Sequence, residues 1–318
     1  MTILFTKGLS VAGRRALKTA LAGLLPRARF SPAPGGLELS GPDPRRLADA
    51  APAIENLPGV AAVKLGMAEA CPLACSRRAP SRRPMDFSRG PVFIAGPCAV
   101  EDEASYLASA AALKAAGAHA LRAAIFKPRS SPYAFQGIGW AGLRIISKAK
   151  KLTGLPLVTE ATDTRQVERL AAVCDVLQIG ARNMRNYELL KEIALSGRAA
   201  LLKRAAGSSL RDWLLSAEYL LAGGCRSVLL CERGDLPLHD GGLDLELMTE
   251  ARRISGIPVL ADPSHPAHDR AGALRLAAKA LRAGADGLLV EASADPLSAR
   301  VDGRHTIDIE AFRGLTGK

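Results

Sequence analysis

Positively charged and hydroxyl side chains gather within residues 121–137. Arg122 stands before a short apolar run, and Lys127, Arg129 and Ser130 follow it. Guanidinium forks, ammonium groups and hydroxyls all suit phosphate or carboxylate oxygens. The pattern indicates a buried strand that delivers charge to an anion-binding site. A solvated basic loop after an ordinary strand is the alternative for any one such motif taken alone.

The chain from residue 91 onward alternates apolar strands with helical segments. The strands are predicted at residues 91–96, 120–126, 155–161, 175–180, 199–204, 227–232, 257–262 and 286–291. The helical segments between them include residues 103–117, 164–173, 210–222 and 269–283. Eight such units predict an α/β fold, a (β/α)8 TIM barrel. A doubly wound open sheet is disfavoured by the even strand count and by the lack of an early glycine fingerprint.

A polar or ionisable group follows every predicted strand. Active sites of these barrels lie where the strands end. Six cations there predict a positive cavity for a substrate with phosphate and carboxylate groups: Arg122, Lys127, Arg129, Arg182, Lys203 and Arg233.

A second set of side chains at the strand ends has the chemistry of a metal site. Cys98, His265 and Glu291 follow the first, seventh and eighth strands, which are neighbours in a closed barrel. Thiolate, imidazole and carboxylate ligands suit a divalent transition metal, and Asp302 is a candidate fourth ligand. Taken singly, Cys98 is more often a small buried apolar residue. The combination favours metal binding.

The first 66 residues predict a separate α+β domain. Strands at 2–5, 27–30, 37–39 and 60–65 and helices at 10–25 and 44–56 follow the β-α-β-β-α-β order of a ferredoxin-like sandwich. Residues 67–90 lose this periodicity and predict a linker, and residues 91–318 form the barrel.

Composition excludes several other classes of protein. No apolar run approaches the roughly 20 residues that span a bilayer, and no signal peptide is recognisable, so we expect a cytoplasmic protein.

The net charge of +12 is concentrated in the first quarter of the chain. Aromatic residues do not alternate there with the arginines Arg77, Arg78, Arg82 and Arg83. This stretch therefore predicts a basic linker and no nucleic-acid site. Six scattered cysteines, including the Cys71 and Cys75 pair, do not predict a disulfide scaffold or a zinc site.

Seven ordered motifs resemble type I 3-deoxy-D-arabino-heptulosonate 7-phosphate synthases. They are Gly96-Pro97-Cys98, Lys127-Pro128-Arg129-Ser130-Ser131, Pro132-Tyr133-Ala134-Phe135-Gln136-Gly137, Gln178-Ile179-Gly180-Ala181-Arg182-Asn183, Leu202-Lys203-Arg204, Cys231-Glu232-Arg233-Gly234 and Asp262-Pro263-Ser264-His265. The related octulosonate 8-phosphate synthases typically have Asn-Arg where Pro128-Arg129 stands here. Residues 1–66 resemble the regulatory domain that some of these enzymes carry.

The resemblance implies a metal-dependent, aldol-like condensation of phosphoenolpyruvate with erythrose 4-phosphate, the first step of the shikimate pathway. By motif position, Arg122, Lys127, Arg182, Lys203 and Arg233 would hold phosphoenolpyruvate, and Arg129 and Ser130 would face the aldose phosphate. Cys98, His265, Glu291 and Asp302 would hold Mn, Fe, Co or Zn. Lys127 is the candidate for proton transfer, and Glu160 and Glu232 would position the cations.

The chain also departs from the family pattern. Ser130 replaces a usual Thr, and Ala123 and Ala124 replace two glycines. Residues 235–244 replace a longer segment that is richer in cations and hydroxyls, and residues 266–268 replace a common Ala-Thr-Gly. Two alternatives therefore stay open, a phosphoenolpyruvate-dependent synthase that uses another aldehyde and a weakly active regulatory paralogue. The resemblance further implies a homotetramer with tyrosine or phenylalanine as effector.

Overall fold

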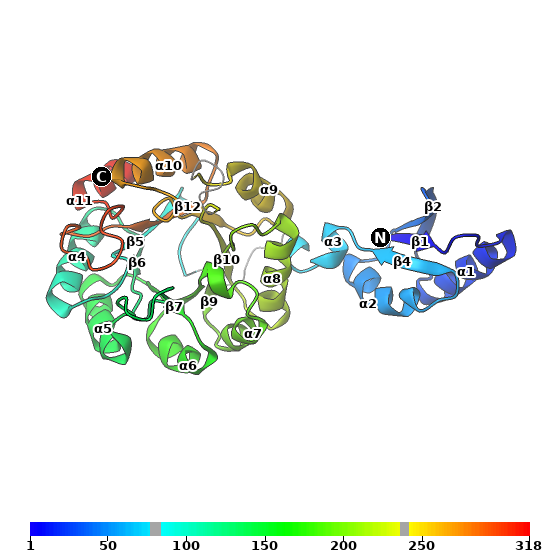
Figure 1. Ribbon diagram of the computed structural model, residues 1–318, viewed down its shortest axis with the longest axis horizontal. Coiled ribbons are helices and arrows are strands. Elements are labelled where there is room, and N and C mark those ends of the chain that lie inside the picture. The colour runs from blue at the N-terminus through cyan, green and yellow to red at the C-terminus, as the bar shows by residue number, and fades with distance from the viewer. Residues whose placement is uncertain (77–83, 236–241) are drawn as a thin grey trace. The chain divides into compact units, whose positions relative to one another are not determined.

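The computed structural model describes residues 1–76, 84–235 and 242–318 and consists of two compact units, Met1–Ser76 and Arg77–Lys318 (Figure 1). Each unit has its own hydrophobic core.

The N-terminal unit is a four-stranded antiparallel sheet with two helices. Its elements are β1 Thr2–Phe5, α1 Val11–Leu24, β2 Arg29–Ala33, β3 Gly36–Ser40, α2 Pro44–Glu55 and β4 Val60–Lys64. The strand order β2-β3-β1-β4 is that of the predicted ferredoxin-like sandwich. Ile3, Leu21 and Ile54 are fully buried in its core. A short helix, α3 Met67–Ala70, and a 3₁₀ turn, η1 Ala74–Ser76, complete the unit beyond residue 66.

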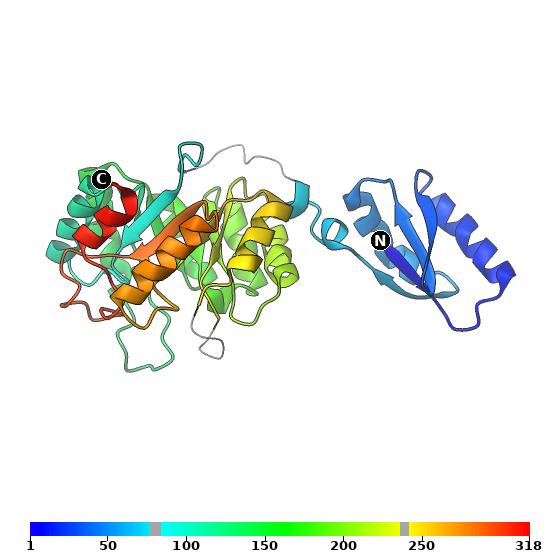
Figure 2. The same ribbon diagram turned by 90° about the horizontal axis from the view of Figure 1, so that it is seen from above.

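The second unit is a closed parallel barrel, which confirms the predicted fold. Its strands are β5 Val92–Gly96, β6 Ala120–Arg122, β7 Leu157–Ala161, β8 Val176–Ile179, β9 Ala199–Lys203, β10 Val228–Glu232, β11 Val259–Ala261 and β12 Gly287–Glu291. The helices are α4 Glu103–Ala115, α5 Gly142–Thr153, α6 Thr164–Val173, α7 Tyr187–Leu195, α8 Leu210–Ala222, α9 Leu245–Ser255, α10 Arg270–Arg282 and α11 Ile309–Thr316. Figure 1 looks along the barrel with the helices around the strands, and Figure 2 shows α10, in orange, along its outer side.

Strand β6 is shorter than the predicted 120–126. The Ala123 N–H still donates to the Val158 carbonyl at 2.8 Å, but the Ala124 carbonyl accepts from the Val100 N–H at 2.9 Å and so bonds to a loop. The regular pairing of β6 therefore ends at Arg122, and the chain continues as a loop. Two further 3₁₀ turns, η2 Gly139–Ala141 and η3 Ala181–Asn183, follow β6 and β8.

The interior of the barrel is filled by apolar side chains. Met85, which precedes β5, is 6% exposed and packs with Val92, Leu229 and Leu260 in the barrel core. The chain just before the first strand is therefore part of the barrel's structure.

The helices begin at defined capping residues. Asp102, Asp163, Ser209 and Asp269 each accept a backbone N–H of the first turn with the side chain. Such caps are worth about 1 kcal/mol each and fix where the loop after each strand ends. Among the described residues, no helix has the length and apolar character needed to cross a bilayer.

Candidate active site

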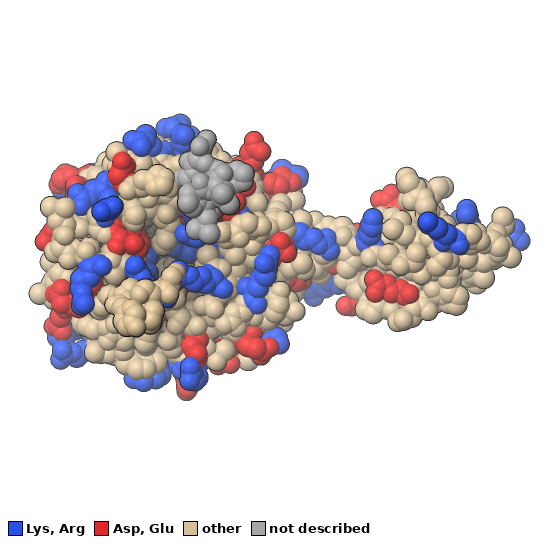
Figure 3. Space-filling model, in the orientation of Figure 1, with Lys and Arg blue, Asp and Glu red and all other residues tan. Residues whose placement is uncertain are grey.

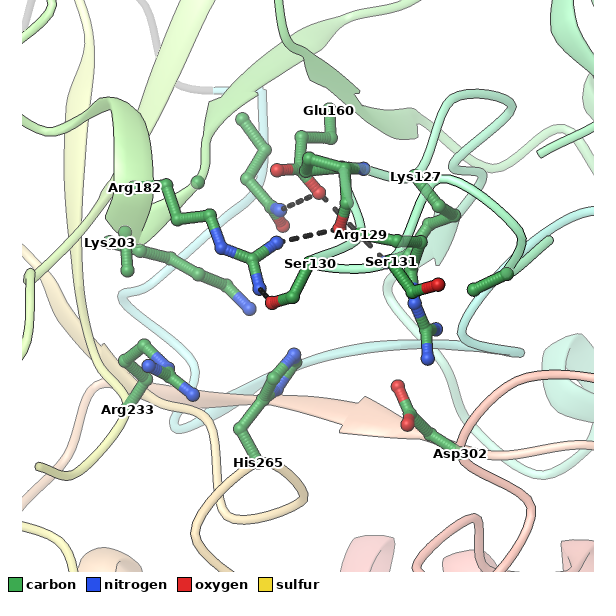
Figure 4. A pocket seen from close by; sticks show the side chains of 15 residues that line it. Lys127, Arg129, Ser130, Ser131, Glu160, Arg182, Lys203, Arg233, His265 and Asp302 are labelled. Atoms are coloured by element: carbon green, nitrogen blue, oxygen red, sulfur yellow. Dashed lines mark hydrogen bonds and ion pairs between the residues drawn. The ribbon is translucent and has the colours of Figure 1, made fainter. Parts of the chain in front are cut away.

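A cavity of about 440 Å³ opens at the carboxyl ends of the barrel strands. It is lined by Lys127, Pro128, Arg129, Ser130, Ser131, Ala134, Glu160, Gln178, Gly180, Ala181, Arg182, Lys203, Arg233, His265 and Asp302. Figure 3 shows Lys and Arg side chains around the hollow in this face, and Figure 4 shows Lys203, Arg233 and His265 pointing into one space. The cavity thus gathers five of the six predicted cations.

Lys127 is held on one wall of the cavity by an acidic partner. Its side chain is buried, and its Nζ lies 3.9 Å from Glu160 Oε2. Gln178 Nε2 donates to the same Glu160 oxygen at 3.2 Å. Gly180 leaves room for the carboxylate, because a Cβ at this position would lie 2.1 Å from Glu160 Oε1. Glu160 is therefore the acidic neighbour of Lys127, and the positioning role expected for it stays a prediction.

Asp262 joins two of the predicted site residues. This fully buried carboxylate accepts a hydrogen bond from Lys203 Nζ, and its Oδ2 lies 2.6 Å from His265 Nδ1. Burial alone raises the pKa of Asp262, but His265 and Lys203 reverse the effect and hold it well below its usual range. Burial lowers the pKa of His265, and the Asp262 carboxylate offsets this only in part. His265 Nδ1 therefore faces a buried carboxylate.

Arg182 bridges the turn after β8 and the loop after β6. Its Nη1 donates to the Pro128 carbonyl at 2.6 Å, and its Nη2 donates to Ser130 Oγ at 3.3 Å (Figure 4). Two nitrogens of the Arg182 guanidinium group are therefore already bonded to this loop. Arg129 and Arg233 also line the cavity and have no ion pair within the described ranges 1–76, 84–235 and 242–318.

Arg122 differs from the other predicted cations because it is buried at the edge of the site. Its Nη1 lies 2.8 Å from Glu291 Oε1, and its Nη2 donates to Cys98 Sγ at 3.7 Å. Burial opposes the charge of Arg122, but Glu291 and the other anionic groups outweigh it and raise its pKa above the ordinary value. Arg122 therefore links the cation set to the predicted metal ligands.

The predicted metal ligands converge at the same end of the barrel. One ligand atom each from Cys98, Glu291 and Asp302 lies within 4.8 Å of the other two. The Cys98 Sγ to Asp302 Oδ2 distance is 3.0 Å. His265 stands beside this cluster, with Nε2 4.0 Å from Glu291 Oε1.

The donor set fits a divalent transition metal. It offers sulfur, carboxylate oxygen and imidazole nitrogen. Glu291 Oε2 is buried without a hydrogen-bond partner in the described parts of the chain, which a cation would satisfy. Burial, followed by the charge of Glu291, raises the pKa of the Cys98 thiol well above its usual value, so metal binding would release its proton.

Asp302 is presented by a tight turn. Its φ of 56° is the only left-handed non-glycine backbone angle within residues 1–76, 84–235 and 242–318. The His305 and Thr306 N–H groups both donate to its carbonyl, each at 3.2 Å. Aspartate tolerates this conformation better than most residues, and such angles are frequent at functional sites.

Two buried residues near the site were not given a role by the sequence analysis. Asp262 follows β11, and only the fold reveals its partners. Arg204 is buried and pairs with Glu232 through Nε to Oε2 at 2.5 Å and Nη2 to Oε1 at 3.0 Å. Successive residues of a strand point to opposite faces, so Lys203 reaches the cavity while Arg204 does not. Glu232 therefore positions Arg204. Its Oε1 also accepts the backbone N–H groups of Gly234 and Asp244.

Part of the divergent segment after Gly234, residues 236–241, lies outside the described residues, as does the arginine-rich stretch 77–83. Two further divergent positions, Ala123 and Ala124, are buried beside β6. Their added methyl groups are accommodated without opening the barrel.

Fold and site together define a (β/α)8 barrel whose mouth carries a cation-lined cavity next to a group of candidate metal ligands. The family model of the DAHP synthetase I family matches residues 88–316, and the chain belongs to this family.

Relatives and solved structures agree with this assignment. The chain is 37% identical over 225 residues to the phospho-2-dehydro-3-deoxyheptonate aldolase of Thermotoga maritima, covering 70% of this chain and 67% of that protein. It is 31% identical to the 2-dehydro-3-deoxyphosphooctonate aldolase of Syntrophotalea carbinolica, covering 69% and 86%. The crystal structure of the Thermotoga maritima DAHP synthase matches with a TM-score of 0.80 at 30% identity, over 99% of this chain and 95% of that one.

Proposed function

We propose that the chain condenses phosphoenolpyruvate with erythrose 4-phosphate to give 3-deoxy-D-arabino-heptulosonate 7-phosphate and inorganic phosphate, the first step of the shikimate pathway. The observation that carries this proposal is the convergence of Lys127, Arg182, Lys203 and Arg233 on one cavity that Asp302 and His265 also line. The cations match a trianionic substrate, and the donor set stands next to them.

In the proposed complex, four cations bind the phosphate and carboxylate of phosphoenolpyruvate: Arg182, Lys203, Arg233 and Lys127. Arg122 contributes its charge from the edge of the site, because Glu291 already occupies its guanidinium. Arg129 and Ser130 stand on the exposed loop after β6 and face the aldose phosphate. A divalent metal on Cys98, His265, Glu291 and Asp302 supplies Lewis acidity to the aldehyde oxygen when bound.

The reaction balances with water as the only other reactant. Carbon 3 of phosphoenolpyruvate forms a bond to the aldehyde carbon, using the electron pair of its double bond, and the aldehyde oxygen takes a proton. Water adds at carbon 2, and the carbon–oxygen bond to phosphate then breaks to leave a ketone. We assign the transfer of this proton to Lys127, and the location of its side chain in the cavity beside Glu160 supports that role.

The aldehyde acceptor decides between this reaction and a close alternative. The chain is also similar to 2-dehydro-3-deoxyphosphooctonate aldolases, so the alternative substrate to test is a different phosphorylated aldose. The test is mass spectrometry of the products formed from phosphoenolpyruvate with erythrose 4-phosphate, arabinose 5-phosphate or ribose 5-phosphate. The proposal expects a seven-carbon product and at least tenfold slower reaction with the pentose phosphates. Preference for a pentose phosphate would replace the proposed substrate.

The described residues that line this cavity belong to the barrel unit. We propose that the N-terminal ferredoxin-like unit is a regulatory domain that binds tyrosine or phenylalanine in a cytoplasmic homotetramer. Because Met85 is part of the barrel core, the informative truncation begins at residue 77. The truncated chain should keep its turnover and lose inhibition by the amino acid. Inhibition of equal strength in both forms would reject the regulatory role.

A further inference from the structure

Asp302 lies farther along the chain from its strand than the other candidate metal ligands. Cys98 and His265 stand within a few residues of the ends of β5 and β11, and Glu291 is the last residue of β12. Asp302 belongs to the long segment between β12 and α11. Its place beside the other ligands therefore depends on contacts that hold this segment against the barrel.

The backbone of Asp302 is held more firmly than its side chain. In the described parts of the chain, the one hydrogen bond to its carboxylate comes from Cys98 Sγ at 3.0 Å, and His305 Nε2 lies 3.8 Å from Oδ1. The Asp302 carbonyl accepts from Thr306 Oγ1 at 3.0 Å as well as from the N–H groups of His305 and Thr306. The direction of the carboxylate therefore follows from the backbone of the turn 302–306.

Arg270, the first residue of α10, fastens this turn to the barrel. Its Nε donates to the Thr306 carbonyl at 2.8 Å, and its Nη2 donates to the Gly303 carbonyl at 3.3 Å. Hydrogen bonds from a charged donor are stronger than those between neutral groups, and both of these are partly buried. The rigid guanidinium thus bonds the turn at both ends of the segment that follows Asp302.

The contacts of Arg270 lie on this turn and not in the cavity. Arg270 does not line the active-site cavity, and it has no ion pair within residues 1–76, 84–235 and 242–318. Directly after the turn, the Ile307 N–H donates to the Glu291 carbonyl at 2.9 Å. The turn is therefore joined on one side to a second candidate ligand and on the other to the helix that follows the His265 loop.

We propose that Arg270 is a positioning residue that holds Asp302 in the metal site, an inference that rests on the metal site of the proposed function. Without the guanidinium, the Gly303 and Thr306 carbonyls lose their bonds to α10, and the turn no longer holds the Asp302 carboxylate beside Cys98 and Glu291. Loss of a residue that orients a metal ligand lowers metal affinity about 10- to 100-fold.

The experiment is a Co²⁺ titration of the full chain against a competing chelator, followed by the absorption of the cobalt–thiolate bond to Cys98. No substrate is present, so the result does not depend on the proposed reaction. Arg270→Met should weaken Co²⁺ binding about 10- to 100-fold. In an Asp302→Ala background, the same change should cause no further loss, because the ligand that Arg270 positions is already absent.

The matched control is Arg275→Met. Arg275 is an exposed cation on the same helix and does not line the active-site cavity, so this variant should bind Co²⁺ like the parent chain. Far-ultraviolet circular dichroism verifies that each variant is folded. If Arg270→Met does not fold, Arg270→Lys takes its place in the same comparison, since an ammonium group keeps the charge but lacks the fork that reaches both carbonyls.

Two results would overturn the role of Arg270 alone. One is equal Co²⁺ affinity in the Arg270 and Arg275 variants, and the other is a loss from the Arg270 change that is as large in the Asp302→Ala background as in the parent. A parent chain that binds no Co²⁺ would reject the metal site itself and this inference with it.

Discussion

Asp262 Oδ2 lies 2.6 Å from His265 Nδ1 and also accepts a hydrogen bond from Lys203 Nζ. One carboxylate thus orients a predicted metal ligand and a predicted substrate-binding cation. A carboxylate beside Nδ1 favours the tautomer whose unshared electron pair is on Nε2, and this Nε2 lies 4.0 Å from Glu291 Oε1. Carboxylate partners of this kind fix the tautomer and orientation of a ligating histidine.

Replacing Asp262 by Asn should therefore weaken both functions at once. The neutral amide offers no negative charge to His265 and Lys203. We therefore expect metal affinity to fall about 10- to 100-fold and the KM for phosphoenolpyruvate to rise. Metal titration with a competing chelator and steady-state kinetics measure the two effects. Glu310→Gln, at an exposed ion pair with Arg313, is the control. A variant with unchanged metal affinity would show that Asp262 does not orient His265.

Gly180→Ala should disturb the position of Lys127 without changing any charge. The added Cβ would lie 2.1 Å from Glu160 Oε1, so the carboxylate must leave its present position beside Lys127. A displacement of this size should lower kcat/KM about 10- to 100-fold. Gly314→Ala is the matched control, because no atom lies within 4 Å of the added Cβ. Equal activity in the two variants would show that the Glu160 contact is dispensable.

The buried Arg204–Glu232 pair should matter for stability more than for chemistry. Arg204→Met would leave the fully buried Glu232 without its charged partner, and breaking such a pair costs about 3–5 kcal/mol. The exposed Arg313–Glu310 pair has similar short contacts, yet Arg313→Met should cost about 0–1 kcal/mol. Urea denaturation of the two variants measures the difference. Equal losses in free energy of unfolding would contradict the assigned role of burial.

Much of the fold follows from local pattern in the sequence. The eight barrel strands lie in largely apolar runs because helices cover them outside and side chains fill them inside, so the runs reveal that eight strands exist but do not fix every strand end. Two of the four predicted barrel helices, Thr164–Val173 and Leu210–Ala222, have the predicted ends, since Asp163 and Ser209 are strong caps. The end of β6 is less predictable, because residues 123–126 remain apolar while their hydrogen bonds pass to loops.

The site is only partly predictable from strand ends. The rule that chemistry follows each strand finds Lys127, Lys203 and His265, and period-two alternation could have separated the buried Arg204 from the cavity. The partners of Asp262 could not be found in this way. It meets Lys203 across a chain separation of 59 residues, and only the closed barrel brings the two together.

Stability at alkaline pH should depend on Cys174. Burial, reinforced by Asp175, raises the pKa of this thiol to about 12. In the unfolded chain this thiol ionises at pH ~8.5. The contribution of Cys174 to the free energy of unfolding is therefore complete below that pH and is lost as the pH rises toward 12. In Cys174→Ala, the free energy of unfolding should fall less steeply above pH ~9, by up to about 1.4 kcal/mol per pH unit. Urea denaturation across this range measures the slope, and identical slopes would contradict the prediction.

The most direct measurement is release of inorganic phosphate from phosphoenolpyruvate by the chelator-stripped chain, with and without restored Mn²⁺, in the presence of erythrose 4-phosphate. We predict that release requires both the aldose and the metal, and that Cys98→Ala shows no release when Mn²⁺ is added back. Release that is unaffected by stripping, or that fails with erythrose 4-phosphate but proceeds with arabinose 5-phosphate, would contradict the proposed reaction.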